Sequence, residues 1–159
     1  MPRKVTKKLQ RNIKPDRKYQ SVLVQRLINK SMLNGKKLAS ERMVYSALEQ
    51  AAKTLKSEEP LEVFERALKN VSPNFEVKSR RVGGANYQIP FEVKGQRQKH
   101  LTIMWFIAAA RAKKGMPMSK RIANELVDAY NQTGTAFKKK EDTHKMAESN
   151  RAFAHFARG

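Results

Sequence analysis

The sequence predicts a mostly α-helical single domain of six helices, with a protruding two-stranded β-hairpin inserted between the third and fourth helices. Three observations predict it. Apolar residues recur at helical spacing through most of the chain, and this spacing changes to alternation over about residues 75–93, around a glycine pair. A length of 159 residues with 40% hydrophobic residues is also sufficient for one hydrophobic core.

Three helices are expected before the hairpin. The first covers about residues 21–33 and ends at Asn34-Gly35, a pair that readily adopts left-handed backbone. The second covers about residues 38–55, and the third ends at Pro73. Their apolar stripes are formed by Leu23, Leu27, Ile28, Val44, Ala47, Leu48, Ala51, Leu55, Leu61, Phe64, Leu68 and Val71.

The hairpin is predicted from two alternating runs around Gly83-Gly84. Phe75 and Val77 alternate with charged residues in the first run, and Tyr87 to Val93 alternate with polar residues in the second. Pro90 cannot donate a ladder hydrogen bond, which favours a two-stranded ribbon with free edges over a central strand.

Helical periodicity returns after the hairpin. The fourth helix, about residues 96–113, is expected to bury Leu101, Met104, Trp105 and Ala108. Trp105 is therefore interpreted as a core residue and not as a platform for base stacking. Ser119 is the expected cap of the fifth helix. One final helix is expected to contain Met146, Phe153 and Ala157.

Charge divides the chain into a basic N-terminal arm and a folded part. The net charge is +20, and residues 1–18 contain eight basic residues against one acidic residue. We expect residues 1–18 to be a flexible arm and residues 19–159 to form the domain. Further basic clusters occupy residues 74–118 and the last 24 residues, whereas residues 60–73 and 119–135 are neutral. Such clusters are typical of phosphate contacts, although any single run is equally consistent with a solvated face.

Several classes of protein fit the sequence poorly. The chain has no cysteine, which excludes disulfides and thiolate metal sites. It has no apolar run of about 18 residues and no apolar signal segment at its start, so neither a membrane nor secretion is expected. None of the three histidines has a metal-ligand spacing. Asp142 and His144 could form an acid–base pair, but a surface helix explains them more simply. We expect neither an enzyme nor a cofactor nor a bound metal.

Two motifs favour binding to structured nucleic acid. The hairpin tip, residues 80–86, is basic and contains small side chains, so it could enter a groove where glycines let the backbone approach phosphate. Lys36 and Lys37 follow Gly35 at a helix N-terminus, where the helix dipole disfavours cations unless an anion lies nearby. Few aromatic residues are present, which argues against binding by single-strand stacking.

These segments resemble ribosomal protein seven of the small subunit, and the resemblance extends over essentially the whole chain. It rests on the pattern from Ser21 to Ala47 that includes GKK at 35–37, on PLEVFERAL at 60–68, on KSRRVGG at 78–84 and on HKMAESNRAFAH at 144–155. The motifs occur in the family's order, and the length is typical of bacterial members.

The resemblance implies six helices with a protruding hairpin and primary binding to the 3′ major domain of small-subunit rRNA. It also implies nucleation of head assembly, a place near the exit-site tRNA and mRNA, and contact with ribosomal proteins nine and eleven. Arg80, Arg81, Gly83 and Gly84 would form the tip near the tRNA and mRNA path. The residues expected on rRNA are Arg3, Lys4, Lys7, Lys8, Arg11, Lys14, Lys36, Lys37, Lys78, Lys94, Arg97, Lys99, Arg111, Lys113, Lys114 and Met116.

The sequence departs from the family pattern at one place, and two alternative interpretations of its function and location remain. Many bacterial members continue after the AH pair at 154–155 with an aromatic tail containing Trp, whereas this chain ends in FARG. Contacts of the extreme C-terminus are therefore not transferred. A helical body with an arginine-bearing ribbon also describes architectural DNA-binding proteins. A cytoplasmic ribosome is expected, an organellar one is the alternative, and no homo-oligomer is expected.

Overall fold

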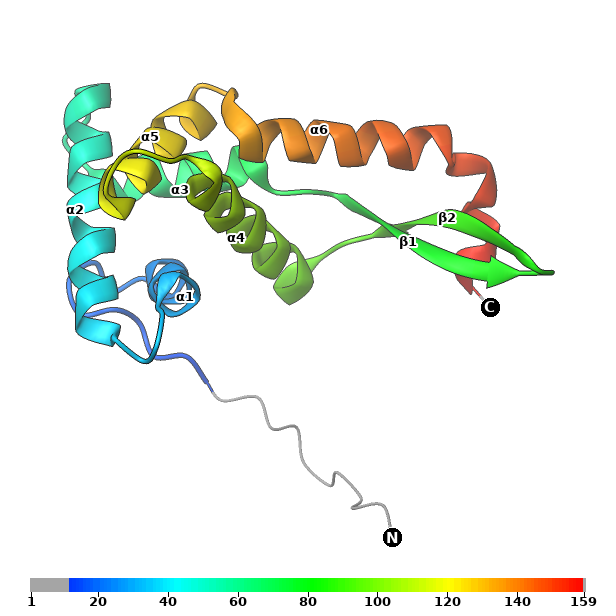
Figure 1. Cartoon of the computed structure of the whole chain (residues 1–159), viewed down its shortest axis with the longest axis horizontal. Helices are drawn as coiled ribbons and strands as arrows, with labels where there is room; N and C mark the ends of the chain where they lie inside the picture. The colour runs from blue at the N-terminus through cyan, green and yellow to red at the C-terminus, as the bar shows by residue number, and fades with distance from the viewer. Residues whose placement is uncertain (1–11, 159) are drawn as a thin grey trace, which may run out of the picture.

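The computed structural model describes residues 12–158 and contains a helical body from which a long β-hairpin projects (Figure 1). The six expected α-helices and the hairpin between the third and fourth of them are confirmed. The elements are α1 (Val22–Ser31), α2 (Lys37–Leu55), α3 (Pro60–Val71), β1 (Phe75–Val82), β2 (Ala85–Glu92), α4 (Gly95–Ala112), α5 (Met118–Tyr130), α6 (Gly134–Ser149) and the 3₁₀ helix η1 (Arg151–Arg158).

The core lies where α5 packs against α2, α3, α4 and α6. Its largest fully buried side chains include Phe64 of α3, Phe106 of α4 and Leu126 of α5. Burial of one such side chain contributes about 1.5–3 kcal/mol. The core therefore holds the helices as one rigid support for the hairpin.

The left-handed backbone predicted between α1 and α2 is present, but it does not end α1, which stops at Ser31 with Met32 at φ −59° and ψ 138°. Asn34 and Gly35 both have positive φ, 51° and 71°. On either side of this pair, the hydroxyls of Ser31 and Ser40 lie 2.7 Å apart, and both donate to the carbonyl of Ile28, at 3.1 and 2.8 Å. These buried bonds fix the end of α1 against the first turns of α2.

The hairpin is a two-stranded antiparallel ribbon, as expected. Val82 pairs with Ala85, so the turn consists of Gly83 and Gly84, with φ of 57° and 90°. A two-residue turn with positive φ at both positions matches the twist of a ribbon, and glycine adopts it without a steric penalty. The apolar residues of the two strands do not share one face. Residues paired across the ribbon point to the same side, and Phe75 pairs with Glu92 while Ile89 pairs with Lys78.

The expected single final helix is wrong, because α6 ends at Ser149 and Phe153 and Ala157 lie in η1. The side-chain amide of Asn150 donates to the carbonyl of Met146 at 2.8 Å and ends the helix. Residues three apart lie above one another in a 3₁₀ helix. The change of helix type therefore aligns Phe153 with Phe156, and both contact the hairpin.

Two smaller expectations about α4 and α5 are also wrong. Met104 is 37% exposed and Ala108 is exposed, whereas Ile103, Phe106 and Ile107 are buried. This stretch is apolar on every side, so its packing against α1, α3, α5 and α6 selects the buried face. Trp105, expected in the core, is half-buried.

Helix α5 begins at Met118, and the residue preceding its first turn is Pro117. Ser119 therefore lies inside the first turn and is not the cap. Proline fixes the φ value that the chain needs as it enters a helix, so this start requires no side-chain cap.

Candidate nucleic-acid interface

The hairpin tip is exposed and basic. Arg81, Gly83 and Gly84 are exposed, and a Cβ added at either glycine would meet no atom within 4 Å. The guanidinium of Arg80 donates through Nη1 to the carbonyl of Phe156 at 2.9 Å. The two arginines of the tip therefore differ in their contacts, because Arg80 is bonded to the C-terminal segment.

Aromatic contacts with η1 support the hairpin. The Tyr87 ring lies 5.0 Å from the Phe153 ring and 5.6 Å from the Phe156 ring, measured between centroids. Figure 1 shows α6 running along the hairpin and η1 crossing it. Our sequence analysis missed this support. The signal that could have found it is the spacing of three between the two phenylalanines.

At the base of the hairpin, carboxylates pair with three of the expected RNA-binding cations. Glu76 is buried; it accepts from Nζ of Lys78 at 2.7 Å and from Nη2 of Arg97 at 2.8 Å. Burial raises the pKa of Glu76, but the bonds from Lys78 and Arg97 outweigh burial and lower this pKa overall. Lys94 pairs with Glu92 at 2.7 Å. Of these three cations, Arg97 links the hairpin to α4, whereas Lys78 and Glu76 both belong to β1.

Lys113 and Lys114 are neighbours with different environments. Nζ of Lys113 lies 2.8 Å from Oε2 of Glu125 and 2.7 Å from Oδ2 of Asp128, and the Glu125 side chain is fully buried. Burial lowers the pKa of Lys113, but the bonds to Asp128 and Glu125 outweigh burial and raise this pKa overall. Lys114 is exposed. Of the pair, Lys113 is therefore the one held by carboxylates, whereas Lys114 lies at the surface.

Lys36 and Arg111, expected from separate segments, line one groove of about 390 Å³. Its floor is apolar and includes Met32 and Met118, and none of the described residues that line it is acidic. Lys37 lies beside this groove at the start of α2 and pairs with Glu41 at 3.8 Å. The structure therefore brings Lys36 and Arg111 together on one cationic edge.

Met116 is half-buried beside that groove. Its carbonyl accepts from Nε of Arg121 at 2.6 Å, and its sulfur lies 3.5 Å from the side-chain amide of Asn124. The loop between α4 and α5 is therefore fixed to α5.

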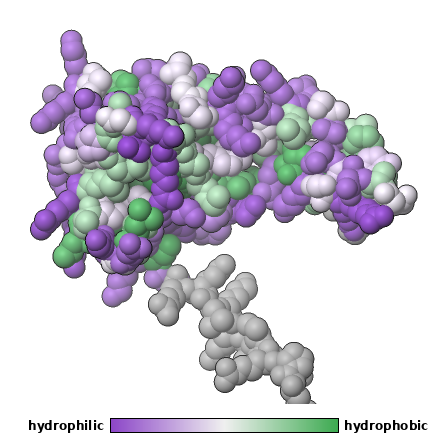
Figure 2. Space-filling model, in the orientation of Figure 1, coloured by the Kyte–Doolittle hydropathy of each residue, from purple (hydrophilic) through white to green (hydrophobic). Residues whose placement is uncertain are grey.

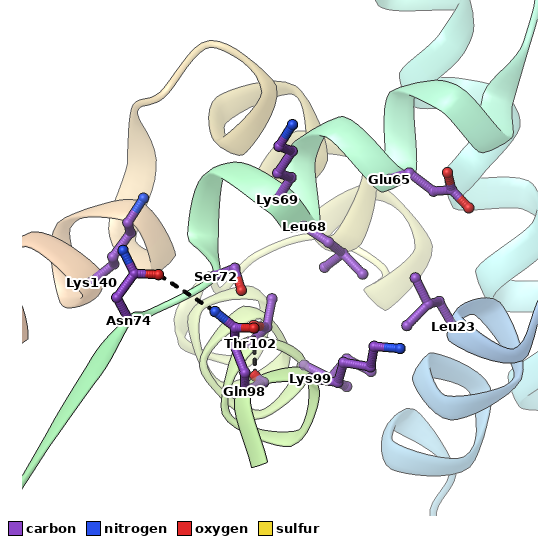
Figure 3. Close-up of a pocket in the computed structure, with 11 residues that line it drawn as sticks. Leu23, Glu65, Leu68, Lys69, Ser72, Asn74, Gln98, Lys99, Thr102 and Lys140 are labelled. Carbon is purple, nitrogen blue, oxygen red and sulfur yellow. Dashed lines mark hydrogen bonds between the residues drawn. The ribbon is translucent and has the colours of Figure 1, made fainter. Parts of the chain in front are cut away.

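Lys99 lines a second groove, of about 490 Å³, between α1, α3, α4 and α6 (Figure 3). Lys69 and Lys140 also line it. Nζ of Lys140 donates to the carbonyl of Asn70 at 2.7 Å, and burial lowers the pKa of Lys140. Lys69 was overlooked because its segment is neutral overall.

A third, smaller groove separates α1 from α4. It is lined by Ile13, Arg26, Asn29, Lys30, His100 and Ile103. Our sequence analysis did not select Arg26 and Lys30, although a spacing of four places both on one face of a helix.

His144 joins the base of the hairpin to α6. Its Nε2 accepts the backbone N–H of Asn74 at 3.0 Å, and its ring packs edge-on against Phe75 with centroids 6.0 Å apart. Burial, and next the charge of Lys140, lower the pKa of His144. Asp142 is exposed. These contacts give His144 a structural role.

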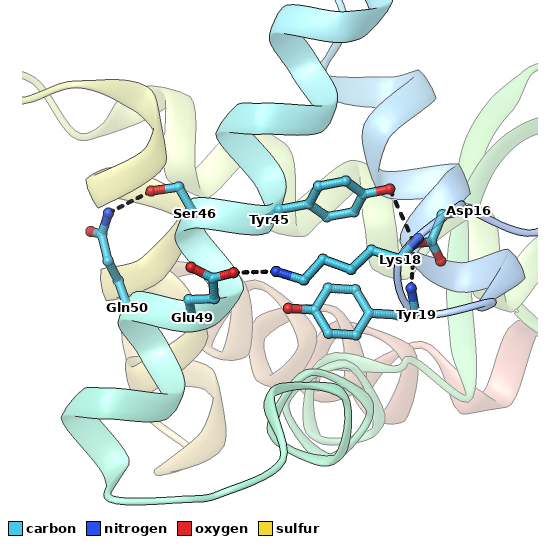
Figure 4. A network of polar contacts seen from close by, with 7 residues as sticks. All are labelled: Asp16, Lys18, Tyr19, Tyr45, Ser46, Glu49 and Gln50. Carbon is cyan, nitrogen blue, oxygen red and sulfur yellow. Dashed lines mark hydrogen bonds and ion pairs between the residues drawn. The ribbon is translucent and has the colours of Figure 1, made fainter.

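The N-terminal segment is attached to the body through Asp16 (Figure 4). The buried Asp16 carboxylate accepts the backbone N–H groups of Lys18, Tyr19 and Ser21 at 3.0, 2.8 and 2.8 Å, and the Tyr45 hydroxyl at 3.2 Å. The Lys18 ammonium pairs with a carboxylate of α2 and lies 5.4 Å and 5.8 Å from two tyrosine rings. Asp16 and Lys18, expected within the arm, thus contact α2.

Lys14 is the one arm cation of the expected RNA-binding set within the described residues, and it is exposed. The remaining members lie outside the described residues; they are Arg3, Lys4, Lys7, Lys8 and Arg11.

The surface around these sites is largely hydrophilic on the face drawn in Figure 2. No helix within residues 12–158 is long and apolar enough to cross a membrane. The same part of the chain contains no cluster of three or more His, Asp or Glu side chains that could hold a metal ion.

Comparison with known proteins gives consistent matches over most of the chain. The family model described as "Ribosomal protein S7p/S5e" matches residues 2–151. A small ribosomal subunit protein uS7 from Chloroflexus aggregans is 58% identical over 148 residues, 93% of this chain and 94% of the relative. The uS7 protein of Thermotoga neapolitana is 55% identical over 92% of this chain and 94% of its own length. That of Roseiflexus is 52% identical over 99% of both. The chain belongs to the ribosomal protein S7p/S5e family.

Proposed function

We propose that this protein is a primary rRNA-binding protein of the small ribosomal subunit, that it binds the 3′ major domain and that it nucleates assembly of the head. As a member of this family, it is a structural and non-enzymatic constituent of that subunit. We place it on the cytoplasmic ribosome, as its bacterial relatives suggest, and we assign it no membrane partner and no homo-oligomer.

The observation that carries this proposal is that some basic side chains of the protein lie against carboxylates whereas others are exposed to solvent. Between Glu76 and Glu92 the hairpin sequence contains no acidic residue, and Arg81 at its tip is exposed. Lys36, Arg111 and Lys114 are exposed on the helical body. An exposed cation without a carboxylate beside it is suited to phosphate, because binding it releases counterions from the nucleic acid.

The test is the salt dependence of binding to an rRNA fragment of the 3′ major domain. We expect the logarithm of the association constant to fall linearly with the logarithm of salt concentration, by about 0.7–0.9 for each phosphate contacted. A salt-insensitive affinity would contradict the proposal. Duplex DNA at matched salt is the competitor that tests the architectural alternative, and DNA that displaces the rRNA fragment would reverse our choice.

We further propose that the hairpin tip lies near the exit-site tRNA and the mRNA, and that the protein is a neighbour of ribosomal proteins nine and eleven. The exposed Gly83-Gly84 turn supports this role, because it lets another backbone approach closely. Replacing Arg80 and Arg81 with Ala should leave binding to the rRNA fragment largely intact and reduce exit-site tRNA occupancy in translating ribosomes. Unchanged tRNA occupancy would contradict this placement.

A further inference from the structure

The 3₁₀ helix η1 lies across the hairpin and contacts one of its faces (Figure 1). Arg80 and Tyr87 are paired across the two strands, so their side chains leave the ribbon on the same side, and both contact η1. Arg81 is the next residue along β1, so it leaves the ribbon on the opposite side, where it is exposed. The two arginines of the tip thus belong to different faces, and η1 lies against the face of Arg80.

The contact between η1 and the hairpin is formed at the surface of the protein. The Tyr87 ring lies 5.0 Å from the Phe153 ring and 5.6 Å from the Phe156 ring, and all three side chains are only half-buried. Residues 151–158 contain no acidic residue, so no carboxylate side chain of η1 strengthens the contact. Within the described part of the chain, the buried core includes no residue of η1. Detachment of η1 therefore requires no unfolding of the helical body.

The acceptor that η1 offers to Arg80 is a neutral group. Nη1 of Arg80 donates to the backbone carbonyl of Phe156 at 2.9 Å. An anionic phosphate attracts a guanidinium more strongly than a carbonyl does, and it can accept two of the guanidinium N–H groups at once. A phosphate at the tip would therefore compete with the Phe156 carbonyl for Arg80.

We propose that η1 is a strap that opens when tRNA binds at the hairpin tip. In the closed state Arg80 is bonded to η1, and Arg81 is the tip arginine that faces the tRNA; in the open state both arginines bind phosphate. The inference rests on the place near the exit-site tRNA that is proposed above for the tip, and it adds a regulation of that site. Coupling between two equilibria is reciprocal, so bound tRNA favours the open strap by the same factor as the open strap favours tRNA.

The first measurement follows the strap itself, in small subunits reconstituted with the full chain. The chain contains no cysteine, so Gln88→Cys in β2 and Ala152→Cys in η1, both at exposed positions, give two specific sites for spin labels that are attached before assembly. Without tRNA the labels should show one short distance, and a longer distance should appear when deacylated tRNA binds. With Arg80→Ala added, tRNA should no longer change the distances, because the competition for Arg80 is removed.

The second measurement is a double-mutant cycle on the affinity of these subunits for deacylated tRNA. Phe153→Ala and Phe156→Ala together loosen the strap, and Phe156→Ala alone replaces this pair if the double variant does not assemble. The matched control is Phe137→Ala, because Phe137 is a half-buried phenylalanine of α6 whose ring lies beside Lys140. Arg80→Ala should weaken tRNA binding about tenfold when the strap is loosened, and less than about threefold in the unmodified chain and in the control.

The outcomes separate the two proposals. If Arg80→Ala and Arg81→Ala together leave the tRNA affinity unchanged, with the strap intact or loosened, the proposed place of the tip fails. If they lower the affinity but Arg80→Ala has the same effect in both backgrounds, only the strap proposal fails. A larger effect of Arg80→Ala in the unmodified chain would show that η1 positions Arg80 for tRNA, and this would also overturn the strap, as would label distances that do not respond to tRNA.

Discussion

The junction of α4, α5 and α6 and the tip of the hairpin both combine a lysine or arginine with glycine, yet they use these residues differently. At the junction, Lys113 pairs with Glu125 and Asp128, and Gly134 lies against the same two side chains. At the tip, the side chain of Arg81 is exposed, and a Cβ added at either turn glycine would meet no atom within 4 Å. Neither a basic residue nor a glycine therefore identifies a binding surface by itself; its neighbours do.

The largest expected effect comes from the lysine of the junction. Lys113→Met leaves the fully buried Glu125 carboxylate without its ammonium partner, and we expect a loss of roughly 3 kcal/mol in the free energy of unfolding. Lys114→Met is the matched control, because Lys114 is the next residue and is exposed; its effect should stay within about 0.5 kcal/mol.

Urea titrations of both variants provide the measurement. Equal stabilities of the two variants would show that the junction does not depend on this ion pair. For RNA binding the order should be reversed, with Lys114→Met weakening the affinity and lowering the salt slope of the folded protein.

The glycines allow a second comparison. Gly134 and Gly84 have nearly the same φ, 87° and 90°, but a Cβ at Gly134 would lie 2.7 Å from Cβ of Asp128 and 3.3 Å from Oε1 of Glu125. Both Ala variants incur the cost of a left-handed residue, about 1–2 kcal/mol. Only Gly134→Ala adds a steric clash, so we expect it to destabilise the protein by roughly 2–3 kcal/mol in total.

Thermal and urea unfolding of Gly134→Ala and Gly84→Ala measure this difference. Equal losses in the two variants would contradict the close packing of α5 against the start of α6.

Truncation of the N-terminal segment provides a third test, and its expected effect on stability is intermediate. Removing residues 1–11 should weaken rRNA binding, because five basic residues are lost, and should leave the melting temperature unchanged. Removing residues 1–18 also deletes Asp16, whose carboxylate accepts three backbone N–H groups and the Tyr45 hydroxyl. We expect this longer truncation to cost about 2 kcal/mol of stability.

Asp16→Ala in the full chain separates the two effects. It should lower stability as the longer truncation does and leave the salt slope of rRNA binding unchanged. Equal stabilities of the two truncations would show that the Asp16 contacts do not hold the segment.

The sequence was sufficient to predict the elements whose signals are local. The helices, the Gly83-Gly84 turn and the two-stranded ribbon follow from apolar spacing and backbone preference, and the structure agrees with them. The face that α4 buries could not be predicted, because its apolar residues surround the helix and tertiary contacts select among them. The end of α6 was also missed, because the hydrogen bond of Asn150 and the contacts of Phe153 with Tyr87 decide it.

For the candidate site, the sequence predicted which segments are basic but not which cations are already paired. The sequence does not distinguish Lys114 from the other basic residues. In the structure, four of those others lie against a carboxylate: Lys78, Lys94, Arg97 and Lys113. For Lys113 the partner is 12 or more residues away along the chain, so no local pattern reveals it.

The smallest expected effect concerns the base of the hairpin and depends on pH. Nε2 of His144 accepts the backbone N–H of Asn74, so it must be unprotonated for this bond to form. Burial and the charge of Lys140 lower the pKa of His144 from its ordinary value of 6.5. The unfolded chain therefore binds a proton at a higher pH than the folded chain does. This contribution to stability is complete above the unfolded pKa and is lost progressively as the pH falls toward the folded pKa.

His144→Gln is the matched variant, because glutamine can accept the same hydrogen bond and does not titrate. Every other titrating group is common to both proteins, so the difference between their free energies of unfolding isolates the contribution of His144. This difference should shift in favour of the variant as the pH is lowered from about 7.5 to about 5. Parallel stability curves would contradict the depressed pKa. If the curves diverge as expected, the joint between the hairpin and α6 weakens in acid while the tip, which contains no acidic residue and no histidine, keeps its charge.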